Sequence, residues 1–174
     1  MKLLKSRKAL STVVTTLIIL VVSVLLATVV TFYAINVTTT RVQEESLQIT
    51  NLHVWCTDSG VASAAFVITN TGGRDAVIDK ITVRGVESAG TNIYYKSVSS
   101  PSDPSWADAP SDLSGQGYTQ VGSDALVLPS GNRIIVYLFN LNHLSTSDIG
   151  VTVGVVVFTA NAQYHKEANV EAAA

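Results

Sequence analysis

The sequence predicts an α+β protein: a long N-terminal hydrophobic α-helix followed by an antiparallel Ig-like β-sandwich. Residues 9–40 contain no charged side chain, which is typical of a membrane-crossing helix. After residue 47 the pattern changes to short apolar segments with period two, separated by turn residues. The chain is too rich in β-branched residues for a disordered protein, so this second part is expected to fold.

The helix is expected to cross a membrane before any assembly. Residues 10–35 read LSTVVTTLIILVVSVLLATVVTFYAI, well beyond the ~18 apolar residues that a span needs. Four cations precede this run, namely Lys2, Lys5, Arg7 and Lys8. They favour a cytoplasmic N-terminus, which places the β domain outside the cell.

Three kinds of hydrophobic N-terminus were compared. A secretory signal peptide has a shorter apolar region, and a simple signal-anchor fits both the length and the charges. The third is a pilin-type leader. Residues 6–12, SRKALST, resemble the class III signal peptide of archaeal type IV pilins and archaellins. That resemblance implies cleavage between Ala9 and Leu10. Val14 stands at the fifth mature position, where bacterial type IV pilins carry glutamate, so the archaeal branch is favoured.

The chain is accordingly divided into a basic leader (1–9), a hydrophobic helix (10–47) and an extracellular β domain (48–174). Small residues recur along one side of the helix, three, four or seven positions apart, and small residues let helix backbones approach closely. The expected self-packing residues are Thr12, Thr16, Ser23, Ala27, Thr31 and Ala34. The alternative is a monomeric anchor whose hydroxyls bond carbonyls of their own helix. Asn36 begins the only Asn-x-Ser/Thr sequon, a possible N-glycosylation site.

Eight strands are expected in the β domain. They cover residues 49–56, 62–69, 77–86, 92–98, 125–128, 133–141, 151–159 and 163–170. The segment 155–158 is apolar on both faces, which predicts a central strand or a subunit contact. Residues 66–73 with 78–85, and residues 128–136 with 151–158, resemble strands of archaellin and archaeal pilin head domains.

Residues 99–117 read as a long surface loop. Trp106 in this loop is expected to be either a packing anchor or an exposed contact residue. Cys56, the only cysteine, is expected to be a small buried residue, with an intermolecular disulfide as the alternative.

No catalytic, cofactor-binding or metal site is expected, so the protein is not predicted to be an enzyme. The three histidines have no partners at ligand spacing, and the loop aspartates Asp103, Asp108 and Asp112 match no EF-hand register. The net charge of −2 falls to about −6 without the four leader cations, which argues against nucleic-acid binding.

The resemblance implies a structural subunit of an archaeal type IV pilus or adhesion filament at the cell surface. Its expected partners are copies of itself in a helical homopolymer, the membrane before assembly, a prepilin peptidase with the assembly machinery, and surfaces or other cells. The alternatives are a membrane-anchored Ig-like binding module and a minor pilin of a secretion or uptake machine.

We predict that the protein isolated from its native cells has lost residues 1–9. Cleavage after Ala9 gives a chain that begins at Leu10, whereas an uncleaved anchor begins at Met1. Intact-mass measurement and N-terminal sequencing distinguish the two, and a mature chain starting at Met1 would contradict the leader assignment.

Overall fold

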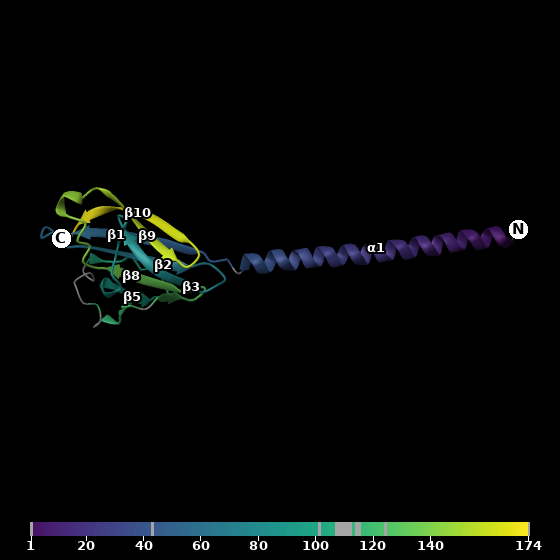
Figure 1. Cartoon of the computed structure of the whole chain (residues 1–174), viewed down its shortest axis with the longest axis horizontal. Helices are drawn as coiled ribbons and strands as arrows, with labels where there is room; N and C mark the ends of the chain where they lie inside the picture. Colours follow the sequence, from purple (N-terminus) through teal and green to yellow (C-terminus); the bar gives the residue numbers. More distant parts are fainter. Residues whose placement is uncertain are drawn as a thin grey trace. The chain divides into compact units, whose positions relative to one another are not determined.

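The computed structural model describes residues 2–42, 44–100, 102–106, 113, 116–123 and 125–173. The chain divides into two compact units, Met1–Val42 and Gln43–Ala174. The first unit consists of one helix and the second contains the strands (Figure 1). The expected order of a hydrophobic helix followed by a β domain is therefore confirmed.

Helix α1 (Lys2–Val42) ends five residues before residue 47, the end expected from its sequence. The reason lies in the carbonyl groups just beyond it. The backbone N–H of Gly73 donates to the carbonyl of Glu44, and the N–H groups of Thr71 and Gly72 donate to the carbonyl of Ser46. Residues 44–46 therefore bond to a turn of the β domain and do not extend the helix.

Ten strands and two described 3-10 turns make up the second unit. Their bounds are β1 (Leu47–Cys56), β2 (Ala62–Asn70), β3 (Ala76–Val83), β4 (Val86–Glu87), η1 (Gly90–Asn92), β5 (Ile93–Ser97), β6 (Thr119–Gln120), β7 (Leu126–Leu128), β8 (Arg133–Leu138), η4 (Thr146–Asp148), β9 (Thr152–Thr159) and β10 (Gln163–Ala172). All eight expected strands are present, with ends shifted by a few residues. The expected strand 77–86 is interrupted by a turn at Arg84 and Gly85, both with positive φ, so that β4 forms a separate short strand.

The strands form one curled mixed sheet in the order β4-β3-β9-β10-β1-β2-β8-β5-β6, with β7 paired to β3 (Figure 1). The expected α+β class is confirmed, but the expected antiparallel sandwich is not, because the strands form a single sheet that includes one parallel pair. β10 pairs antiparallel with β9 on one side and parallel with the end of β1 on the other, from Val54↔Val170 to Cys56↔Ala172. β10 therefore lies between β9 and β1. It joins the last strand of the chain to the first strand of the domain within one continuous sheet.

The inner face of the curl encloses the main hydrophobic core. Its fully buried members include Phe66, Ile68, Val83, Val136 and Val155. β9 lies between β3 and β10, so the expectation of a central strand at residues 155–158 is confirmed. Burial of these side chains supplies most of the driving force for folding the domain.

A second, smaller apolar cluster covers the opposite face of β1, β2 and β8. It contains Trp55, Ala65, Val67, Ile135, Tyr137, Phe139 and, from the long loop, Leu113. β2 is therefore buried on both faces, which explains why its sequence of small and apolar residues, ASAAFVITN, contains no charge.

Asn70, which is 1% exposed, connects the turns at one end of the sheet through the hydrogen bonds of its side chain. Its side-chain amide donates to the carbonyls of Arg74 (2.7 Å) and Leu128 (3.0 Å), and its Oδ1 accepts from the N–H of Gly72 (3.0 Å). A Cβ at Gly72 would lie 2.5 Å from the carbonyl oxygen of Glu44. Only glycine fits there without displacing residues 44–46.

We predict that Asn70→Ala lowers the free energy of unfolding by roughly 2–4 kcal/mol, because the carbonyls of Arg74 and Leu128 and the N–H of Gly72 lose this partner. Urea unfolding of the detergent-solubilised chain, followed by tryptophan fluorescence, measures the loss. Asn142→Ala, in an exposed turn, is the matched control and should change stability by less than about 0.5 kcal/mol. Equal losses of unfolding free energy in the two variants would show that the hydrogen bonds of Asn70 do not stabilise the domain.

Candidate functional sites: the apolar helix and an aromatic-lined cavity

Helix α1 presents an apolar surface that the rest of the described chain does not cover. Leu10–Thr39, 30 residues long, is apolar and long enough to cross a membrane, and none of it is buried. Large side chains such as Phe32 (71% exposed) and Val29 (65%) lie free on this surface. An apolar surface of this size requires a lipid or protein environment.

The hydroxyl groups of the helix bond to its own backbone. Ser23 donates to the carbonyl of Ile19 (2.7 Å) and Thr31 to that of Ala27 (2.8 Å). The same kind of bond is made by Thr15, Thr16, Thr28, Thr38 and Thr39. In the single chain these polar groups therefore need no partner from outside, and the helix can lie in hydrocarbon.

The residues singled out from the sequence lie as follows. The Ala9–Leu10 bond is inside α1. The six small residues expected to pack against other copies, Thr12 to Ala34, are all exposed. The Asn36 amide donates to the carbonyl of Phe32 (2.9 Å), so the sequon is helical. Cleavage, self-packing and glycosylation at these positions stay predictions.

Glu45 connects the first residues of the β domain to the end of the chain. It lies beyond the helix, where its Oε2 accepts from the Asn161 amide (2.8 Å) and its carbonyl accepts from the Tyr164 hydroxyl (3.3 Å). A tyrosine phenol is protonated at neutral pH, and burial raises the pKa of Tyr164 further, so its hydroxyl serves as a donor. Glu45 thus joins residues 44–46 to the β9–β10 hairpin.

Trp106 is half-buried, and its packing agrees with the first of its two expected roles, the packing anchor. Its ring packs against Trp55, with centroids 6.0 Å apart, and anchors the described part of the loop on the outer face of the sheet. The same residue forms one wall of an open cavity of about 320 Å³. Tyr94 and Phe139 form another wall and contact each other edge to face at 5.5 Å.

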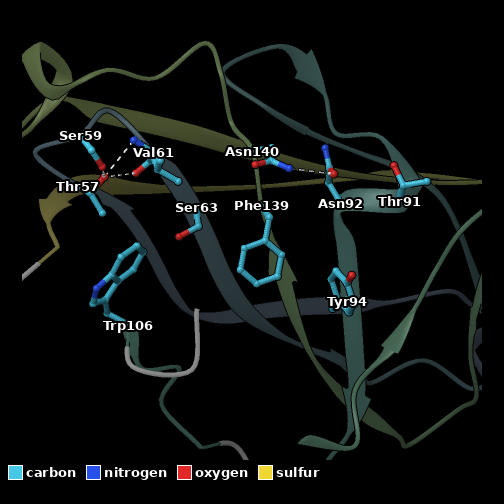
Figure 2. A pocket seen from close by; sticks show the side chains of 10 residues that line it. All are labelled: Thr57, Ser59, Val61, Ser63, Thr91, Asn92, Tyr94, Trp106, Phe139 and Asn140. Atoms are coloured by element: carbon cyan, nitrogen blue, oxygen red, sulfur yellow. Dashed lines mark hydrogen bonds between the residues drawn. The ribbon is translucent and has the colours of Figure 1, made fainter. Parts of the chain in front are cut away.

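The cavity is lined by residues from five separate segments (Figure 2). These are Thr57, Ser59 and Val61 after β1, Ser63 in β2, Thr91, Asn92 and Tyr94 from η1 and β5, Trp106 in the loop, and Phe139 and Asn140 after β8. Two hydrogen-bonded groups lie at its rim. The hydroxyls of Thr57 and Ser59 are 2.8 Å apart, and the Asn140 amide donates to Asn92 Oδ1 (3.3 Å).

His53 is stacked on Trp55, a member of the second apolar cluster, with ring centroids 5.5 Å apart. Its Nδ1 lies 3.1 Å from Glu171 and its Nε2 lies 3.2 Å from Asp103. The described residues contain no group of three or more His, Cys, Asp and Glu placed to hold a metal ion. Asp108 and Asp112 lie outside the described residues.

Cys56 is fully buried, and its Sγ contacts the carbonyl of Thr57 at 3.6 Å. Burial is the main cause that raises the pKa of its thiol, with smaller contributions from Asp148 and Asp58. The thiolate is the reactive form of cysteine. Cys56 is therefore unreactive for two reasons: its side chain is buried, and its raised pKa keeps it in the thiol form. Of the two roles expected for Cys56, the buried apolar residue agrees with its position.

No family model matches the chain, and the search of curated proteins found no similar sequence. Assignment of a function therefore depends on the helix and the cavity themselves. The sequence analysis singled out Trp106 but none of the other nine residues that line the cavity. The one sequence signal for it is Ser63, the only hydroxyl among the otherwise apolar residues 62–68 of β2.

We predict that Cys56 does not react with a maleimide in the folded protein and reacts fully in 6 M guanidinium chloride. Thr146→Cys in the Cys56→Ala background is the matched control, because Thr146 is exposed. It should be labelled within minutes without denaturant. Rapid labelling of native Cys56 would contradict its burial.

Proposed function

We propose that this protein is a pilin-like structural subunit that polymerises through helix α1, as the resemblance of residues 6–12 to archaeal class III signal peptides suggests. In this proposal the leader is removed after Ala9, the helices pack together, and the β domains lie at the filament surface. The observation that carries it is the length of the exposed, uncharged helix surface.

A bilayer alone is a poor match for that length. At ~1.5 Å per residue, Leu10–Thr39 is about 45 Å long, whereas the hydrocarbon layer is ~30 Å thick. Even a tilt of ~40°, the upper end of the usual range, accommodates only about 39 Å. Packing against copies of the same helix covers the whole length, because every copy offers an equally long apolar surface.

The small-residue side of the helix supports the same proposal. Ser23, Ala27, Thr31 and Ala34 leave room for a neighbouring backbone, and hydroxyls bonded within the chain do not obstruct close packing. Contacts that repeat from head to tail without closing give an open helical polymer. Adhesion to surfaces or other cells would then fall to the β domain.

The second candidate is a β domain tethered to the cell surface by an uncleaved helix. The observation that favours it is the set of intrahelical hydroxyl bonds, which let a single helix remain in lipid. The two candidates differ in what surrounds the helix in the final state.

A pair of double variants tests the proposal in the native host. Ser23→Leu with Ala27→Leu enlarges the small side of the helix and should abolish filaments in sheared material, because the backbones can no longer approach. Val21→Leu with Val29→Leu enlarges the opposite side and should leave filaments visible by electron microscopy.

Both variants keep the helix apolar, so both should be found in the membrane fraction. A tethered domain predicts a different result: wild type and both variants stay membrane-bound and monomeric in detergent, no filament is seen, and residues 1–9 are retained. That result would reject the filament proposal.

A further inference from the structure

The cavity beside Trp106 contains a polar group without a partner. Ser63 is 1% exposed, and its hydroxyl oxygen makes no hydrogen bond to any described protein group. In Figure 2 this oxygen lies between the rings of Trp106 and Phe139. An unpaired buried hydroxyl destabilises a protein by about 1–3 kcal/mol, and alanine would fill the same space without that loss. A ligand group that bonds to Ser63 would account for the serine.

The aromatic walls are held in place before any ligand arrives. Trp106 rests on Trp55, which is 5% exposed, and Tyr94 rests on the edge of Phe139, which is 7% exposed. Rings fixed by other rings lose little conformational entropy when a ligand packs on them. The cavity is therefore a preorganised site with two aromatic walls and a hydroxyl in its floor.

The lining defines the class of ligand. None of the ten lining residues carries a charge, so an anionic or cationic ligand would be buried without a counter-charge. Seven of them carry a hydroxyl or amide in the side chain, so a purely apolar ligand would leave Ser63 unpaired. The volume of about 320 Å³ is at the lower end of the range for small-molecule sites.

A sugar ring meets these requirements. Its C–H faces pack on aromatic rings, while its hydroxyls bond to serine, threonine and asparagine at its edge. We propose that this cavity binds one neutral sugar unit of a glycan, with Trp106 and Phe139 against its faces and Ser63 bonded to a hydroxyl. The proposal goes beyond filament assembly and applies equally to a filament subunit and to a tethered domain.

The test uses the full chain in a detergent without a sugar head group. The probes are the methyl glycosides of mannose, glucose, galactose, N-acetylglucosamine and fucose. Cyclohexanol serves as an apolar ring with one hydroxyl, and N-acetylneuraminic acid as an anionic sugar. Binding is followed by tryptophan fluorescence and by saturation-transfer NMR. At least one neutral glycoside should bind saturably, with a Kd on the order of 1 mM, and more tightly than both comparison ligands.

Ser63→Ala separates a ligand role from a structural one. It should weaken binding of that glycoside at least fivefold while the melting temperature stays the same or rises, because the unpaired hydroxyl is gone. Ser63→Val, which fills the floor, should abolish binding. Ser123→Ala, at an exposed serine outside the cavity, is the matched control and should bind like the wild type.

Three results would overturn the proposal. The first is no saturable binding of any neutral glycoside, and the second is equal or tighter binding of cyclohexanol or of the anionic sugar. The third is unchanged glycoside affinity in Ser63→Ala. None of these results bears on filament formation, which is measured separately by electron microscopy.

Discussion

Removal of the apolar helix surface from water is the constraint on which the architecture depends. Thirty residues without a charge cannot remain solvated, and none of them is buried within the single chain. The helix satisfies its own hydrogen bonds, down to the hydroxyls of Ser23 and Thr31, so it can exchange one dry environment for another without breaking them. Under the proposed function, this independence from a particular environment would let one segment serve first as a membrane anchor and then as the core of an assembly.

The β domain is organised to hold the chain where it arrives from the helix. Residues 66–73 and 128–136 each contribute a turn at this point. Asn70 bonds to the carbonyl of Leu128, and the Ser130 hydroxyl donates to the carbonyl of Gly72 (2.6 Å). Residues 44–46 are bound to the first of these turns, and Glu45 is bound to the β9–β10 hairpin. Residues that the sequence identifies only as turn residues therefore bind the first residues of the domain.

The sequence was sufficient to predict the helix, its approximate length and eight strands, because hydrophobic runs and period-two alternation depend on local burial. It was insufficient for β4 and β6, since two residues carry no periodicity. The parallel pairing of β10 with β1 joins residues more than a hundred positions apart, which no local pattern encodes. The cavity is a similar case: Trp106 was recognised as either an anchor or a contact, but Ser63 gains its meaning only when the loop covers the outer face of β2.

The position of β1 has a mechanical consequence. Tension that arrives through Glu44 passes directly into this strand, which is bonded to β2 along one edge and to β10 along part of the other. Pulling it lengthwise loads many hydrogen bonds in parallel, whereas an edge strand could be peeled away one bond at a time. Under the proposed function, a domain that must stay folded while its cell drifts or swims against a fixed object would benefit from receiving the load at an interior strand.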